Sequence, residues 1–158
     1  MEKYVIALGS SHYNAYFYLE RAVFLLKNKS DFLFISQSKM YKNYSINTRK
    51  KLSFLNCCVA VKTNLSALIL YKELKVIEQK LGRIRPYKNS PRTIDLDVLL
   101  CLNFNYKKDN FFVPHKELLK RDFFIIPAIE ALNLAKWPIN FKLNKLGRIF
   151  NTNRILSA

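Results

Sequence analysis

Residues 90–100 read SPRTIDLDVLL, an apolar run typical of a strand that nevertheless carries two aspartates just after an arginine. Aspartate is unfavourable in a packed strand because its charge resists burial. Side chains alternate between the two faces of a strand. The expected faces are one with Thr93, Asp95, Asp97 and Leu99 and one with Ile94, Leu96, Val98 and Leu100. We therefore expect the apolar face to pack under helices and the aspartates to lie on an open face.

The segments before this strand predict an order of strand, helix, strand, strand, helix, strand. Apolar spacing places the earlier elements at 3–9 (strand), 14–28 (helix), 31–41 (strand), 52–63 (strand) and about 66–81 (helix), with a polar loop at 42–51. Gly82 ends the second helix, and Asn64 or Ser66 is its expected N-cap. This order is the split βαβ pattern. We predict a ferredoxin-like α+β fold, βαββαβ, with a mostly antiparallel sheet and helices on one face.

The remainder of the chain is expected to form a C-terminal extension. It contains at least one more helix, near 116–131, followed by a tail with little periodicity. A length of 158 residues argues for a single domain over 1–158. No apolar stretch approaches the length that spans a membrane. Cys57, Cys58 and Cys101 have neither metal-site spacing nor a disulfide framework, which fits a reducing compartment. We expect a cytoplasmic monomer without a membrane partner.

The charge balance favours anionic partners. The chain has 27 basic and 11 acidic residues, a formal net charge of +16, which suits nucleotides, nucleic acid or an anionic surface. A lysine-rich solvated surface explains part of this excess. RNA binding by a ferredoxin-like sheet usually requires an aromatic RNP1 string, which the sequence lacks. Asp95 and Asp97 would also repel RNA, so we expect no specific nucleic-acid partner.

The paired aspartates and nearby arginines together predict a site for a metal–nucleotide complex. Two residues apart in a strand, the Cα atoms of Asp95 and Asp97 lie about 6.6 Å apart, so their carboxylates can converge on a cation. Mg²⁺ takes one or two carboxylates together with waters and substrate phosphates. Arginine grips phosphate through two donors at once, and candidates are Arg83, Arg85, Arg92 and Arg121. The alternative is a solvated polar face beside a basic loop.

Longer motifs resemble a known family. PRTIDLDVLL at 91–100, followed by VPHKELLKRDFFIIPAIEA at 113–131, is similar to the 6-hydroxymethyl-7,8-dihydropterin pyrophosphokinases of folate biosynthesis. ALGS at 7–10, FLN at 54–56 and IEQKLGRIR at 77–85 also match, in the same order. The resemblance implies the ferredoxin-like fold. It also implies transfer of pyrophosphate from ATP to 6-hydroxymethyl-7,8-dihydropterin, with release of AMP.

The resemblance assigns roles to particular positions. Asp95 and Asp97 would bind two Mg²⁺ ions together with the phosphates of ATP, the co-substrate. Phe54 and Phe123 would sandwich the flat pterin ring, and Asn56 would hydrogen-bond its edge. The residues implied in ATP binding are Glu78, Arg83, Arg85, Arg92, His115 and Arg121. Catalytic roles are implied for Arg83, Arg92, Asp97, His115 and Arg121.

Two other functions stay open at this point. One is a pseudoenzyme that keeps the fold as an interaction module, since the family's ALGSN is ALGSS here and the loop at 42–53 lacks proline and glycine. The other is a basic RNA-binding domain of the same fold. The implied metal ligands and phosphate arginines are all present, so we expect an active enzyme.

Overall fold

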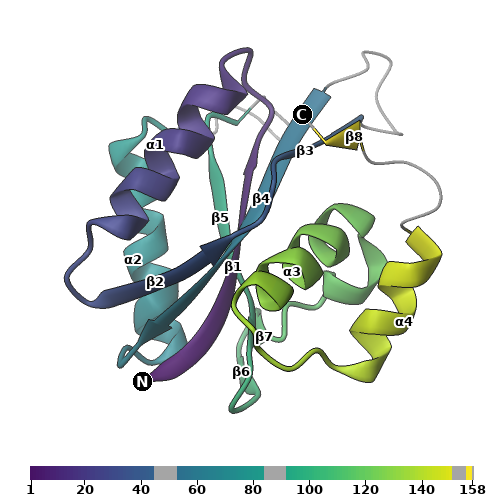
Figure 1. Cartoon of the computed structure of the whole chain (residues 1–158). Helices are drawn as coiled ribbons and strands as arrows, with labels where there is room; N and C mark the ends of the chain where they lie inside the picture. The colour runs from purple at the N-terminus through teal and green to yellow at the C-terminus, as the bar shows by residue number, and fades with distance from the viewer. Residues whose placement is uncertain (45–52, 84–91, 151–155, 158) are drawn as a thin grey trace.

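The structure is a computed structural model that describes residues 1–44, 53–83, 92–150 and 156–157 (Figure 1). The strands are β1 (Glu2–Ser10), β2 (Phe32–Gln37), β3 (Tyr41–Tyr44), β4 (Ser53–Thr63), β5 (Asp95–Cys101), β6 (Tyr106–Lys108), β7 (Phe111–Val113) and β8 (Leu156–Ser157). The helices are α1 (Ala15–Lys27), α2 (Ala67–Lys80), α3 (Asp122–Leu134) and α4 (Phe141–Phe150), with a short 3₁₀ turn at Leu118–Lys120. β6 and β7 form a separate hairpin.

The main sheet has the order β5-β1-β4-β3-β8, and β2 also pairs with β4. Each pairing in this sheet is antiparallel, as expected for an α+β fold. The strand predicted at 31–41 is two strands that pair with opposite ends of β4. Ser38 lies between them, and its backbone N–H and hydroxyl bind the carbonyl and N–H of Cys58, each at 2.9 Å. The chain therefore stays alongside β4 as it passes from β2 to β3.

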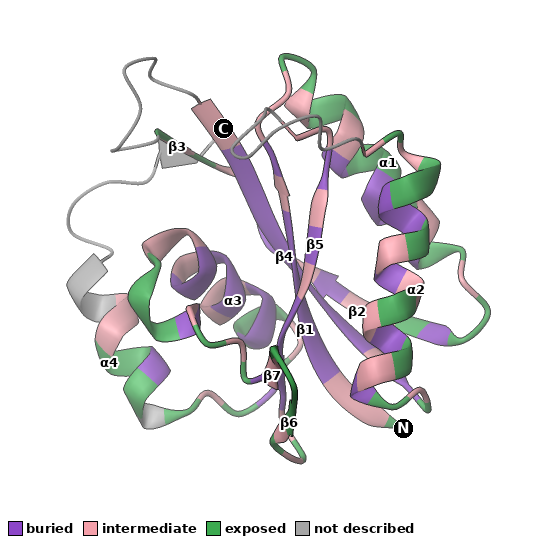
Figure 2. Ribbon diagram, turned by 180° about the vertical axis from the view of Figure 1, so that it is seen from behind, coloured by how far each residue is buried: buried purple, intermediate pink, exposed green. Residues whose placement is uncertain are grey.

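Helices cover both faces of the sheet, so the expectation of helices on one face is wrong (Figures 1 and 2). α1 and α2 pack with Leu8, Val59 and Leu96 on one face. α3 packs with Ala7 and Ala60 on the other, and α4 packs against α3. The physical reason is that β1 and β4 are apolar on both sides over most of their length, and a sheet with two apolar faces needs two covers.

The helix expected near 116–131 begins later than predicted, because a 3₁₀ turn precedes α3 and the helix itself starts at Asp122. α4 was not predicted from the tail. α2 begins after Ser66 and is followed by Gly82 with φ +72°, as expected. Among the described residues, no helix combines the length and the apolar character that crossing a membrane requires.

β5 keeps the predicted alternation only as far as Leu99. The pairing with β1 shifts by one residue at this point, so Ile6 faces Val98 while Val5 faces Leu100. An extra residue in one strand turns the next side chain to the opposite face. Leu100 therefore lies in the core beneath α3 beside Leu99, and its expected place under α1 and α2 is wrong. The two aspartates precede the bulge and share one face, as predicted.

Candidate active site

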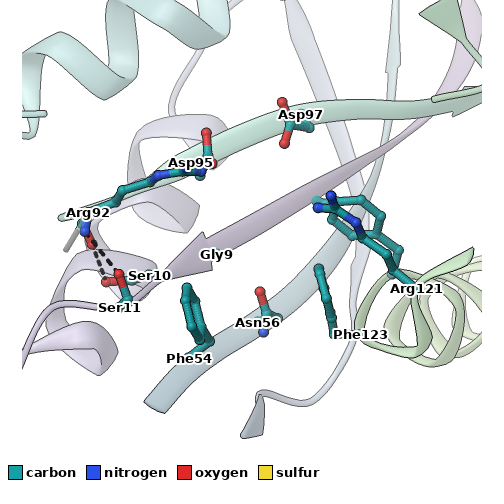
Figure 3. A pocket seen from close by; sticks show the side chains of 12 residues that line it. Gly9, Ser10, Ser11, Phe54, Asn56, Arg92, Asp95, Asp97, Arg121 and Phe123 are labelled. Atoms are coloured by element: carbon teal, nitrogen blue, oxygen red, sulfur yellow. Dashed lines mark hydrogen bonds and ion pairs between the residues drawn. The ribbon is translucent and has the colours of Figure 1, made fainter. Parts of the chain in front are cut away.

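The predicted residues gather where α3 leaves part of the sheet uncovered. A pocket of about 100 Å³ lies there, over the end of β1 and the starts of β4 and β5 (Figure 3). On β1, Ala7 pairs with Asp97 and Gly9 with Asp95, so the open face of the sheet forms the floor of this pocket. Seven of the predicted residues line it: Phe54, Asn56, Arg92, Asp95, Asp97, Arg121 and Phe123.

Two aromatic rings flank one end of the pocket. Phe54 comes from the start of β4 and Phe123 from the first turn of α3, and Figure 3 shows Asn56 between them. Asn56 is buried, and its Nδ2 donates to Asn43 Oδ1 at 2.5 Å. Its Oδ1 lies against Gly9, where an added Cβ would come within 2.8 Å of it. The site therefore offers a flat slot between two rings, with an amide at its base.

Asp95 is held by two arginines. Its Oδ1 pairs with Arg83 Nη2 at 2.8 Å and its Oδ2 with Arg92 Nη1 at 2.5 Å. The backbone of Arg92 is fixed by the end of β1: its carbonyl accepts from Ser11 N and Ser10 Oγ, and its N–H donates to Ser11 Oγ. Ser11 is the residue by which this chain departs from the family's ALGSN, and here it anchors an arginine predicted to bind phosphate.

Arg83 and Glu78 lie behind Asp95 and do not line this pocket. The Arg83 side chain is only 7% exposed and pairs with Glu78 as well as with Asp95. Glu78 is buried on α2, and its Oε1 also accepts the backbone N–H of Leu96 at 2.6 Å. Direct contact of Glu78 with ATP stays a prediction, because its carboxylate is taken up by protein groups in this structure.

The negative charge of Asp97 is less completely neutralised by neighbouring cations than that of Asp95. The nearest cation paired with it is Lys75, whose Nζ lies 3.9 Å from Oδ1. Burial raises the pKa of Asp97 above its usual value, and the negative charge of Asp95 raises it further. Neighbouring positive charges, chiefly Lys75, act in the opposite direction. The incompletely neutralised carboxylate of Asp97, next to that of Asp95, favours the approach of a cation.

His115 lies beyond Asp97 and lines a second pocket. Its backbone N–H donates to Leu99 O at 2.7 Å, and its Nδ1 accepts from Glu117 N at 3.2 Å. The ring also packs edge-on against Phe124. Burial lowers the pKa of His115 below its usual value, although the carboxylate of Asp97 acts in the opposite direction. With Nδ1 engaged, Nε2 is the ring nitrogen left for a ligand.

The second pocket, of about 420 Å³, lies between α2 and the β6–β7 hairpin. Leu68 and Tyr71 of α2, Phe111 of β7, His115 and Asp97 are among its walls. Asp97 thus lines both pockets. Sequence reasoning missed this pocket because it missed the hairpin. The signal was KKDNFF at 107–112, two short β-like runs joined by two turn-forming residues.

The other two predicted residues are Arg121 and Arg85. The Arg121 side chain is partly exposed, and its guanidinium lies 5.5 Å from the centre of the Phe123 ring and 3.6 Å from Glu117 Oε2. Figure 3 shows it reaching over Phe123 into the first pocket. Arg85 falls in the segment 84–91, outside the described residues.

The donor set at the aspartates suits a magnesium ion bound jointly with a phosphate ligand. Within the ranges that the structure describes, no group of three or more histidine, cysteine, aspartate or glutamate side chains is arranged to hold a metal ion by itself. An all-protein cage is thus not formed among those residues. Mg²⁺ is commonly bound by one or two carboxylates, with waters and substrate phosphates as its other ligands. Asp95 and Asp97 beside the arginines fit that requirement.

Comparisons with known proteins agree with this geometry. The family model described as 7,8-dihydro-6-hydroxymethylpterin-pyrophosphokinase (HPPK) matches residues 5–133. The 2-amino-4-hydroxy-6-hydroxymethyldihydropteridine pyrophosphokinase of Bacillus subtilis is 34% identical over 125 residues, which cover 79% of this chain and 75% of the relative. The enzyme of that name from Haemophilus influenzae is 28% identical over 151 residues, covering 96% and 94%.

A solved structure supports the fold. The crystal structure of Plasmodium falciparum HPPK-DHPS superimposes with a TM-score of 0.68 at 16% sequence identity. The match covers 96% of this chain but 44% of that longer chain. The predicted ferredoxin-like α+β class is therefore confirmed. The resemblance first seen in the motifs is confirmed as well: the chain belongs to the 7,8-dihydro-6-hydroxymethylpterin-pyrophosphokinase family, a family of ATP-dependent transferases of folate biosynthesis.

Proposed function

We propose that this chain transfers the pyrophosphoryl group of ATP to the hydroxymethyl oxygen of 6-hydroxymethyl-7,8-dihydropterin and releases AMP. The observation that carries this proposal is the position of Asp97, which lines both pockets. A transfer between two bound molecules requires their reacting ends to meet at one place. We place the meeting point of the two reacting ends at the wall that both pockets share. This wall carries the carboxylate of Asp97, which the sequence motifs assigned to metal binding.

The pterin occupies the first pocket. Its flat ring stacks between Phe54 and Phe123, because offset stacking suits aromatic faces. Asn56 meets the edge of the ring at the base of the slot, and its bond to Asn43 fixes the amide plane. Transfer at the wall shared by the two pockets then requires the hydroxymethyl arm to point toward Asp97.

ATP occupies the second pocket. The base lies among the apolar and aromatic walls formed by Leu68, Tyr71 and Phe111. The phosphates run past His115 toward Arg92 and Arg121 of the first pocket, and Lys108 and Lys116 also line the second pocket. The roles of Arg83, Arg85 and Glu78 in ATP binding belong to the same proposal.

Asp95 and Asp97 would hold two Mg²⁺ ions together with the phosphates. Bound there, the ions would supply charge neutralisation to the phosphoryl group and its leaving group. The protein groups around them position the substrates: Arg92 is anchored by the end of β1, and Arg121 is carried by the turn before α3. Positioning and preorganised charge provide most of the rate enhancement in phosphoryl transfer.

We further propose that the protein works as a single-domain monomer in the cytoplasm, without specific nucleic-acid or membrane partners. The free, buried thiols of Cys57, Cys58 and Cys101 support a reducing compartment. The acidic pair on the open face argues against RNA there. Light scattering on purified protein at micromolar concentration tests the oligomeric state, and a dimer mass would contradict the proposal.

The direct test of function is product analysis by ³¹P NMR. ATP and Mg²⁺ are incubated with the purified chain, with and without the pterin. The proposal expects AMP and a pyrophosphorylated pterin only when the pterin is present. Formation of ADP and a monophosphorylated pterin would contradict pyrophosphoryl transfer. Absence of any product from a folded chain that binds neither substrate would contradict the assignment to catalysis.

A further inference from the structure

β5, which carries the two aspartates, lies at the end of the described sheet, with β1 as its neighbour. An unpaired strand edge leaves N–H and C=O groups in need of partners. At Leu96, between the aspartates, two side chains of α2 supply them. The N–H of Leu96 donates to Glu78 Oε1 at 2.6 Å, and its carbonyl accepts from Lys75 Nζ at 3.0 Å. Helix side chains thus take the place of a neighbouring strand.

Lys75 and Glu78 also bind each other. Lys75 Nζ donates to Glu78 Oε1 at 2.7 Å, which closes a triangle with Leu96. Glu78 is 2% exposed, and its other oxygen pairs with Arg83. Since a buried carboxylate is stable only with its partners in place, loss of Lys75 would disturb both Glu78 and the carbonyl of Leu96.

The triangle controls the direction of the aspartates. The N–H of Leu96 belongs to the peptide unit that begins at Asp95, and its carbonyl belongs to the unit that ends at Asp97. Holding both groups fixes the two peptide planes from which the carboxylates project. Lys75 Nζ additionally lies 3.9 Å from Asp97 Oδ1, so one ammonium group contacts the strand and approaches the carboxylate.

The contact of Lys75 with β5 is not needed to pack α2 against the sheet. Leu74 and Ile77 of α2 are buried in the same core as Leu96 and already hold the helix against the sheet. Lys75 is a polar group added to that contact, and its side chain remains 27% exposed. Sequence reasoning singled out Glu78 but not Lys75, since a lysine on an amphipathic helix is usually a solvated one.

We propose that Lys75 is a positioning residue of the active site. It acts through Leu96 and Asp97 to hold the two aspartates in the geometry that binds the metal nucleotide, without contacting the pterin. This inference rests on the proposed function, because the aspartates matter only if they bind that complex.

The test compares three variants. Lys75→Met removes the ammonium group and keeps the apolar stem. Lys75→Arg keeps a charge and donors. Lys72→Met removes an exposed lysine from the same helix and is the matched control. Steady-state kinetics give kcat and both KM values per folded molecule, and NMR hydrogen exchange follows the amide of Leu96.

Lys75→Met should lower kcat at least tenfold, since a bond to a charged group is lost where the reacting geometry is set. The KM for the pterin should stay within about twofold, because Phe54, Phe123 and Asn56 are untouched. Exchange at the Leu96 amide should accelerate about tenfold as Glu78 loses its partner. Lys75→Arg should recover most of the kcat, and Lys72→Met should match the native chain.

The proposal is overturned if Lys75→Met keeps native kcat, or if its only effect is a lower melting temperature. It is equally overturned if Lys72→Met loses as much activity. If the native chain shows no pterin-dependent AMP, the proposed function fails instead. In that case two measurements without turnover still test whether Lys75 orders the aspartates: the exchange rate of the Leu96 amide and the affinity of the free protein for Mn²⁺. If both are unchanged in Lys75→Met, the role proposed for Lys75 is refuted.

Discussion

Gly9→Ala is expected to damage pterin binding while leaving ATP binding intact. Gly9 is the β1 residue that pairs with both Asn56 and Asp95, so it lies under the junction of the pterin slot and the acidic pair. A Cβ at this position would come within 2.8 Å of Asn56 Oδ1. That distance is several tenths of an ångström too short for a carbon–oxygen contact. Asn56 must therefore move.

The movement is costly because Asn56 is buried and its amide is already bonded to Asn43. A shift of a few tenths of an ångström tilts the amide away from the edge of the pterin. Losing the geometry of one hydrogen bond costs about 1.4 kcal/mol, which corresponds to about tenfold in affinity. Overpacking should also lower the free energy of unfolding by about 1–3 kcal/mol.

The assay is a fluorescence titration of the pterin, paired with calorimetric titration of a non-hydrolysable ATP analogue with Mg²⁺. The expected result is at least a tenfold rise in the pterin Kd with the nucleotide Kd unchanged. The double variant Gly9→Ala/Asn43→Ala also removes the bond that fixes the amide plane, so it should not recover the loss. Pterin affinity within twofold of native in Gly9→Ala would refute the placement of Asn56 at the base of the slot.

Two further predictions follow from the same structure. Phe123→Ala should weaken pterin binding by about tenfold, because one of the two stacking faces is lost, and should leave the nucleotide affinity unchanged. If the two titrations showed equal losses of affinity for both ligands, the assignment of the ligands to separate pockets would be contradicted. Burial raises the pKa of the Cys57 thiol to about 12, so the folded chain should not react with a thiol reagent at pH 8 and should react after denaturation. Rapid labelling of Cys57 in the native state, followed by peptide mass mapping, would contradict its burial.

The parts of the fold that follow local rules were predictable. Alternation placed Asp95 and Asp97 on one face, and the order of strands and helices gave the topology. The parts that depend on three-dimensional pairing were not. At the break between β2 and β3, Ser38 bonds to Cys58 of β4, a long-range contact that local patterning does not report. The bulge that turns Leu100 toward α3 likewise depends on the register with β1.

The site residues also fall into a group that could be predicted from the sequence and a group that could not. Residues with an evident chemical type, such as the aspartates, Arg92, Phe54 and Phe123, could be assigned from motifs, and the fold brings them to one pocket. The nucleotide pocket required the short hairpin, whose strands are too brief for a clear periodic signal. Lys75 could not be singled out at all, because its proposed role depends on β5 lying at the edge of the described sheet, which exists only after folding.

The measurement that tests the central claim most directly is the rate of pterin-dependent AMP formation by the native chain and by Asp97→Asn, with both substrate affinities determined in parallel. Asn keeps the size of Asp97 and removes the charge at the wall common to both pockets. The account predicts that Asp97→Asn binds the pterin normally and forms AMP at least a hundredfold more slowly. Near-native turnover by this variant would show that the transfer does not take place at Asp97.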